Sequence, residues 1–156
     1  MYELISDEGY HYIISECATY GELLNEISSK PYTEEDIAYI TKQLFCVISY
    51  CHSKGVIHKN LNIHNIFVES IKERRMEIKV GNFETGIVCV NKIQWSEELG
   101  TIDYIAPEVL KGVYVETSDV WSIGVILFVI LSGLLPFKEH QTVKTLNFIG
   151  LFFYSL

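Results

Sequence analysis

The feature that most constrains the fold is an uninterrupted apolar run in the last third of the chain. Val120–Leu131 contains no charged residue, and Ser122 is its one hydroxyl side chain. The run is too short to cross a bilayer, because a spanning helix needs roughly 20 such residues. The pattern predicts a helix over Asp119–Leu131 that is apolar on nearly all sides and is therefore central. The rest of the 156 residues, an ordinary length for one domain, would pack around it.

A second helix is predicted from a capping pattern that precedes an apolar stripe. Thr33 and Asp36 have the spacing of a capping box, and the acidic residues of this turn suit the positive end of a helix dipole. The apolar residues that follow are mostly three or four apart and indicate one buried face: Ile37, Ile40, Leu44, Val47, Ile48 and Cys51. We expect this helix to end near Gly55.

Shorter elements complete the predicted fold. Aromatic and β-branched residues around Gly9 indicate a β-hairpin, and residues 21–27 indicate a short helix. Two strand candidates, Asn65–Glu69 and Met76–Val80, flank a charged loop that we interpret as solvated. The segment 81–118 has no steady period and is typical of a long functional loop. The expected class is mainly α with short β hairpins, an α+β fold.

Composition and charge argue against some classes of function. The net charge is −8 and the pI is about 5.1, which disfavours nucleic acid because phosphate binding needs clustered Lys and Arg. No signal-peptide pattern opens the sequence, so we expect neither a nucleic-acid nor a membrane partner. The cysteines form no Cys-x-x-Cys pair and lie in apolar stretches, which favours free thiols acting as small hydrophobes in a reducing cytoplasm: Cys17, Cys46, Cys51 and Cys89.

Four short blocks carry the chemical information. They are HKNLNIHN at His58–Asn65, GNFE at Gly81–Glu84, GTIDYIAPE at Gly100–Glu108 and DVWSIG at Asp119–Gly124. In order and spacing they resemble the protein-kinase motifs H-R-D-L-x-x-x-N, D-F-G and A-P-E, followed by the opening of the family's central helix. The resemblance covers residues 1 to about 138 and is strongest to the calcium-dependent and calcium/calmodulin-dependent Ser/Thr kinases.

The resemblance implies a protein-kinase fold divided at the hinge between two lobes. Residues 1–16 would be the last two strands of the small lobe and the entry to the hinge, 17–138 the large lobe, and 139–156 an atypical tail. The family's Gly-rich loop, strand Lys and helix Glu would all lie before residue 1. The sequence is therefore interpreted either as a fragment of a kinase or as the product of a truncated gene.

The resemblance also implies part of a nucleotide pocket. Ser15 would stand at the gatekeeper position, and the backbone of Glu16 and Ala18 would face adenine. Phe67 would lie beneath the adenine, and Glu22 would meet ribose or a basic substrate side chain. No cofactor is expected beyond weak binding of ATP with Mg²⁺, because nothing in these residues would cover the phosphates.

The positions that would transfer phosphate are altered. Phosphoryl transfer needs a base for the hydroxyl proton and Mg²⁺ to neutralise the phosphates. Asn60 stands at the base position and cannot accept a proton at neutral pH, and Asn62 replaces the phosphate-binding Lys. Asn65 matches the family's metal-ligand Asn, but Asn82 replaces the D-F-G carboxylate on which Mg²⁺ binding depends. Glu84, at the glycine position of D-F-G, is a remote candidate for a substitute carboxylate.

Recognition residues are partly changed, whereas structural positions are retained. His64 replaces an acidic residue that reads substrate Arg, and Lys59 replaces an Arg that clamps a phosphate, so it keeps the charge without the bidentate fork. The retained structural positions are His58, Phe83, Glu108 and Asp119. We expect Asp119 to accept backbone N–H groups of the His58–Asn60 turn. Asp119→Ala should then unfold the protein, and Asn60→Ala should be nearly neutral.

The predicted function is that of a pseudokinase, a kinase-like module that binds or scaffolds an unidentified protein partner without transferring phosphate. One alternative is an ATP-dependent Ser/Thr protein kinase of which this is a fragment. The other is a truncated product with no function. No EF-hand loop occurs in these residues, so regulation by directly bound calcium is not supported within them.

Overall fold

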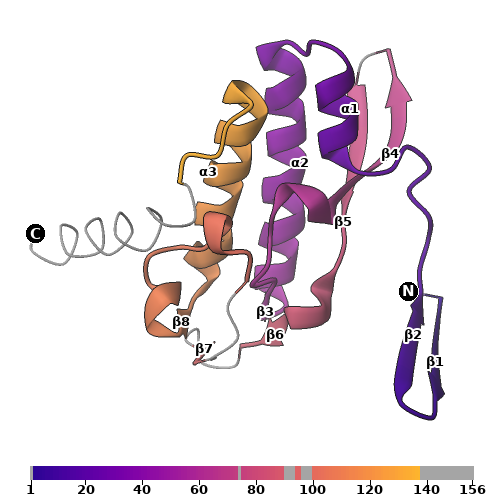
Figure 1. The fold of residues 1–156 in the computed structure, drawn as a ribbon, viewed down its shortest axis with the longest axis vertical. Coiled ribbons are helices and arrows are strands. Elements are labelled where there is room, and N and C mark those ends of the chain that lie inside the picture. The colour runs from indigo at the N-terminus through magenta and orange to yellow at the C-terminus, as the bar shows by residue number, and fades with distance from the viewer. Residues whose placement is uncertain (1, 74, 90–93, 96–99, 138–156) are drawn as a thin grey trace, which may run out of the picture.

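The computed structural model describes residues 2–73, 75–89, 94–95 and 100–137 (Figure 1). The predicted tail, residues 139–156, lies outside this part of the chain. The described α-helices are α1 (Leu23–Ser29), α2 (Glu34–Ser53) and α3 (Glu116–Ser132). They lie side by side in the body of the molecule, with the β4–β5 hairpin beside α1 and α2 (Figure 1).

The strands form antiparallel pairs and no larger sheet within the described residues. The pairs are β1 (Glu3–Asp7) with β2 (Tyr10–Ile14), β3 (Val56–Ile57) with β6 (Ile87–Val88), β4 (Ile66–Lys72) with β5 (Arg75–Val80), and β7 (Gln94–Trp95) with β8 (Val113–Tyr114). The predicted α+β class with short hairpins is confirmed. The predicted loop 81–118 also contains 3₁₀ turns at Phe83–Thr85, Ile102–Tyr104 and Val109–Lys111.

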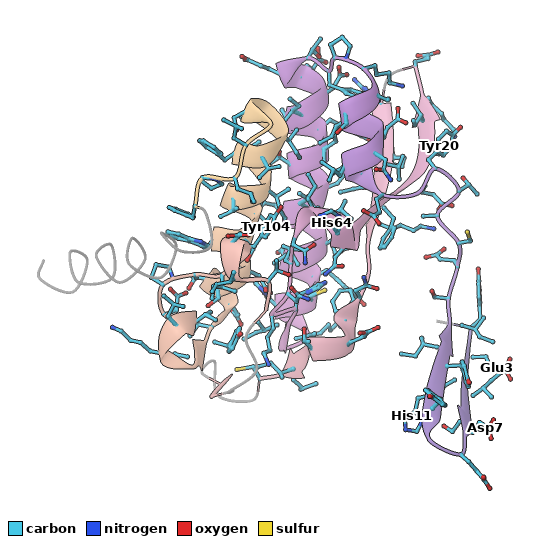
Figure 2. All side chains as sticks on the ribbon, in the orientation of Figure 1. Glu3, Asp7, His11, Tyr20, His64 and Tyr104 are labelled. Atoms are coloured by element: carbon cyan, nitrogen blue, oxygen red, sulfur yellow. The ribbon has the colours of Figure 1, made fainter. Side chains whose placement is uncertain are left out.

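The β1–β2 hairpin stands apart from the body, as the positions of Glu3, Asp7 and His11 show (Figure 2). Its turn depends on Gly9, whose φ of 103° is a conformation that glycine adopts without steric cost. Every residue of both strands is exposed. The hairpin predicted from the sequence is confirmed, but its apolar side chains contribute nothing to the core of the described residues.

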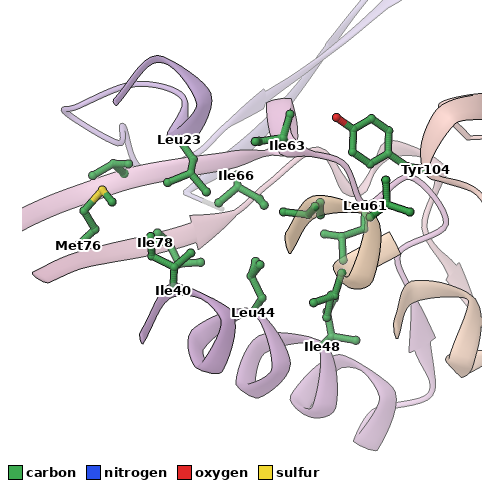
Figure 3. Packing of buried hydrophobic residues seen from close by; sticks show 14 residues of the cluster. Leu23, Ile40, Leu44, Ile48, Leu61, Ile63, Ile66, Met76, Ile78 and Tyr104 are labelled. Carbon is green, nitrogen blue, oxygen red and sulfur yellow. The ribbon is translucent and has the colours of Figure 1, made fainter. Parts of the chain in front are cut away.

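The capping box at the start of α2 is confirmed. The Thr33 hydroxyl accepts from the Asp36 amide at 3.3 Å, and the Asp36 carboxylate accepts from the Thr33 amide at 2.9 Å. The helix ends at Ser53, close to the predicted end. Its apolar stripe meets α1 and the β4–β5 hairpin in the main core, which includes Leu23, Ile40, Leu44, Ile48, Ile66, Met76 and Ile78 (Figure 3).

Helix α3 begins three residues before the predicted start and is buried or half-buried over most of its surface. Ile123, Val125 and Ile126 join the main core, but Val120 and Phe128 are exposed. The predicted central position is therefore confirmed for most of the helix surface, with one exposed stripe among the described residues. The apolar composition of a helix indicates that burial is favourable on every side. It does not indicate which residues of the protein pack against each side.

The cysteines also differ in part from their predicted setting. All four are free, as expected. Cys17 and Cys46 are exposed, however, because Cys17 lies in the extended segment after β2 and Cys46 on the outer face of α2. Among the described residues, no helix is both long enough and apolar enough to cross a membrane.

Candidate functional site

A cleft of about 890 Å³ lies between the segment that follows β2 and the end of β5. Its lining includes all five residues predicted for a nucleotide pocket: Ser15, Glu16, Ala18, Glu22 and Phe67. The opposite side of the cleft is formed by residues 79–84, which contain the Gly-Asn-Phe-Glu block. The structure therefore brings the predicted hinge and the altered D-F-G motif to one cavity.

The cleft carries more negative than positive charge. Lys79 is the one Lys or Arg among the described lining residues, whereas the lining carboxylates are Glu16, Glu22 and Glu84. Its ammonium group pairs with Glu16 at 2.6 Å and with Glu69 at 3.0 Å. The hydrogen bond to Lys79 holds the pKa of Glu16 below its ordinary value. The positive charge of Lys79 is thus already paired with two carboxylates near the predicted hinge.

Asp119 anchors the loop that carries the HKN block. Its carboxylate is 1% exposed and accepts the backbone N–H groups of His58 at 2.9 Å and Lys59 at 3.1 Å, as predicted. The His52 ring, which the sequence reading missed, lies 2.8 Å from the same carboxylate. Three groups from two segments therefore converge on one buried side chain at the start of α3.

Lys59 has an unusual backbone conformation at this anchor. Its φ of 68° lies in the left-handed region, which side chains with a Cβ seldom adopt. The bond to Asp119 supports this conformation, and the Lys59 ammonium lies 4.7 Å from the centre of the Tyr114 ring. The ring face attracts the ammonium group in a cation–π contact. Lys59 is the residue predicted to replace a phosphate-clamping Arg.

His58 is held as a neutral ring. Its Nε2–H donates to the Gly81 carbonyl at 3.0 Å, and its Nδ1 accepts from the Asn60 amide at 3.3 Å. Burial lowers the pKa of His58 below its ordinary value. The ring also packs on Phe83 with 4.4 Å between centroids. These contacts tie the HKN loop to the GNFE block, as expected for structural positions.

Asn60, at the predicted base position, acts as a hydrogen-bond acceptor for the segment at Thr101. Its Oδ1 accepts from the Thr101 amide at 3.0 Å, from the Thr101 hydroxyl at 2.8 Å and from the Asn62 amide group at 3.1 Å. Gly100 allows this approach, because a Cβ there would come within 2.5 Å of the Lys59 carbonyl. The prediction that Asn60→Ala would be nearly neutral is at odds with these contacts.

The two predicted metal positions, Asn65 and Asn82, are hydrogen-bonded to each other. The Asn82 amide nitrogen donates to Asn65 Oδ1 at 2.7 Å, and Asn65 in turn donates to the Asn60 carbonyl at 2.8 Å. Asn82 adopts a left-handed conformation with φ of 58°, which Asn tolerates better than most residues. The one oxygen that Asn65 could offer a metal therefore already accepts a hydrogen bond from a neutral amide. No cluster of three His, Cys, Asp or Glu able to hold a metal occurs in the described residues.

Two further predicted positions have partners of their own. His64 Nδ1 lies 2.9 Å from the Glu22 carboxylate. Glu22, which was expected to meet ribose or a basic side chain, is therefore paired with His64, which was expected to replace an acidic residue. Glu108 accepts from the Ser118 hydroxyl at 2.8 Å, which ties the A-P-E block to the first turn of α3.

Comparison of the sequence with known proteins identifies the family. Residues 1–151 match the protein kinase domain. The chain belongs to the protein kinase family. It is similar to calcium-dependent protein kinase 4 of Plasmodium falciparum (isolate 3D7), with 41% identity over 92% of this chain and 28% of that protein. It is also similar to calcium/calmodulin-dependent protein kinase type II of Caenorhabditis briggsae, with 34% identity over 90% of this chain and 27% of that protein. The chain thus spans little more than a quarter of the length of these relatives.

Proposed function

We propose that this kinase-family chain is a pseudokinase, a module that binds or scaffolds a protein partner and does not transfer phosphate. The observation that carries the proposal is the hydrogen bond between Asn82 and Asn65. Mg²⁺ is usually held by one or two carboxylates together with substrate phosphates. Here both protein positions are neutral amides that are hydrogen-bonded to each other, and neither supplies a carboxylate.

The base position supports the same proposal. An amide cannot take the proton of an attacking hydroxyl, and losing a general base costs roughly 10²–10⁴-fold in rate. The Asn60 oxygen is in addition occupied by three donors. The loop is therefore arranged as a hydrogen-bonded structural turn.

The charge of the cleft argues against tight nucleotide binding. ATP with Mg²⁺ would bring its phosphates toward residues 82–84, where Glu84 adds a carboxylate. The lysine of the cleft is engaged by Glu16 and Glu69 at the hinge end. We propose that the cleft binds ATP weakly or not at all, and that Mg²⁺ does not strengthen the binding.

A second candidate is a Ser/Thr kinase of which this chain is a part. It is favoured by the 41% identity to a protein named a calcium-dependent protein kinase, and Glu84 would then have to supply the missing carboxylate. A truncated product without function is the remaining alternative. The cytoplasmic setting and the protein partner belong to the leading proposal and rest on the free thiols and the acidic charge.

A phosphotransfer assay tests the proposal. The chain is incubated with γ-labelled ATP, Mg²⁺ and a mixed set of basic, neutral and acidic peptides, and the expected result is no label above an enzyme-free control. The double variant Asn60→Asp/Asn82→Asp should also remain inactive, because Lys79, the one Lys or Arg among the described lining residues, stays paired with Glu16 and Glu69. Transfer by the unmodified chain that disappears in Asn65→Ala would contradict the pseudokinase and favour the kinase.

A further inference from the structure

The outer face of helix α2 carries a groove of about 580 Å³, here called the α2 groove. Its lining consists of Lys42, Phe45, Cys46, Ser49, Tyr50 and Ser53. Two aromatic side chains give it an apolar centre, since Phe45 is 45% exposed and Tyr50 is 65% exposed. Exposed apolar surface marks an interaction site when its members are contiguous. The centre of the α2 groove therefore favours an apolar occupant.

The α2 groove is positively charged, although the net charge of the chain is −8. Lys42 lines one end of it. Lys54 lies at the other end, where its ammonium group is 5.7 Å from the centre of the Tyr50 ring. Among the described residues the lining contains no Asp or Glu, and neither lysine forms an ion pair. The expected occupant is therefore apolar in its centre and acidic at both ends.

The β1–β2 hairpin presents a face with this pattern. Paired residues of an antiparallel ladder point to the same side. The register places three pairs on one face, here called the hairpin face: Glu3 with Ile14, Ile5 with Tyr12, and Asp7 with Tyr10. Glu3 and Asp7 lie on one side of the hairpin and His11 on the other (Figure 2). Every residue of the hairpin face is exposed, and residues 2–16 contain no Lys or Arg.

The two surfaces match in length as well as in charge. Glu3 and Asp7 are about 13 Å apart along β1. Lys42 and Lys54 are about 18 Å apart along α2. The flexible four-carbon stems of the two lysines close the difference of about 5 Å. The carboxylates can therefore pair with the lysines at both ends while the apolar centres of the two surfaces meet.

The hairpin that fits the α2 groove belongs to a second copy of the chain. Within one chain, the segment after β2 is held to the β4–β5 hairpin. Glu16 pairs with Lys79 at 2.6 Å, and the Tyr20 amide donates to the Val68 carbonyl at 3.2 Å. The β1–β2 hairpin thus stands apart from the body of its own chain (Figure 1). If each copy places its hairpin on α2 of the other, the result is a symmetric dimer with two identical contacts.

We propose that the chain forms a symmetric dimer in which the hairpin face of each copy docks in the α2 groove of the other. The exposed apolar residues of the hairpin, which contribute nothing to the core of their own chain, are buried at this interface. The proposal does not depend on whether the chain transfers phosphate, because no residue of the hairpin face or the α2 groove lines the cleft.

Reciprocal charge reversal tests the proposal on the whole chain. Sedimentation velocity at increasing protein concentration should show a monomer–dimer equilibrium for the unmodified chain. The groove variant Lys42→Glu/Lys54→Glu and the hairpin variant Glu3→Lys/Asp7→Lys should each weaken the dimer roughly ten-fold or more, because like charges then meet at both contacts. An equimolar mixture of the two variants should dimerise as the unmodified chain does, because lysines again meet carboxylates at both contacts.

A control variant separates this contact from a general effect of charge. Lys72→Glu/Arg75→Glu changes exposed residues of the β4–β5 hairpin and alters the net charge as much as the groove variant does, so it should leave the dimer unchanged. Recovery on mixing also shows that both charge-reversed variants are folded. An unmodified chain that stays monomeric at every concentration would overturn the proposal. A dimer that survives either charge reversal, or two variants that fail to dimerise when mixed, would overturn it as well.

Discussion

Removing the carboxylate of Asp119 should cost a large fraction of the stability of this chain. Asp119→Ala leaves the His58 and Lys59 amides without their acceptor and separates His52 from its partner. Each unsatisfied buried donor costs roughly 1–3 kcal/mol. For the two backbone amides we expect a total of about 2–6 kcal/mol. Intact domains have about 5–15 kcal/mol in all.

Urea denaturation followed by far-UV circular dichroism measures this loss. The matched control is Glu116→Ala, which removes another carboxylate from the first turn of the same helix. Glu116 is not buried, so its removal should cost less than about 1 kcal/mol through the helix dipole. The expected result is a much lower midpoint, or no cooperative transition, for Asp119→Ala alone. Equal midpoints for the two variants would refute the claim that Asp119 holds the loop.

Three further predictions concern single sites. The folded-state pKa of His58 lies below its ordinary value of 6.5. The stabilising contribution of the neutral ring is therefore complete above pH 6.5 and is lost as the pH falls below 6.5. The urea midpoint should decrease between pH 7 and pH 5, and it should decrease less in His58→Phe. Thr33→Ala should cost about 0.5–2 kcal/mol through the lost cap, with Ser53→Ala at the other end of α2 as the control in thermal melts. Asn60→Ala should cost about 1 kcal/mol by freeing Thr101, and Thr101→Val should reproduce the effect; a midpoint unchanged in both would contradict the contacts at that loop.

Much of the fold could be predicted because its longer elements have local signatures. The capping box at Thr33 and Asp36 and the stripe behind it locate α2, and Gly9 locates the first hairpin. The segment 81–118 could not be resolved in this way, since strands of two residues and 3₁₀ turns of three residues contain no repeat. The exposure of α3 could not be predicted either, because composition records what a helix favours and not what contacts it.

The sequence predicted which residues belong to the candidate site, but it did not predict which of them form hydrogen bonds with each other. Motif spacing identified Asn60, Asn65 and Asn82, but the bond between Asn65 and Asn82 joins residues 17 apart in sequence. The pair Glu22–His64 spans 42 residues and the pair His52–Asp119 spans 67. Such contacts depend on how the chain folds back on itself, and no local pattern encodes them.

Binding of Mn²⁺, as a paramagnetic substitute for Mg²⁺, tests the central claim most directly. The chain is titrated with Mn²⁺ at a fixed concentration of ATP, and free Mn²⁺ is measured by electron paramagnetic resonance against a control with ATP and no protein. Because Asn82 and Asn65 are neutral amides bonded to each other and supply no carboxylate, the account predicts the same free Mn²⁺ with and without the chain. Saturable binding of Mn²⁺ to the chain that is lost in Asn65→Leu would contradict it.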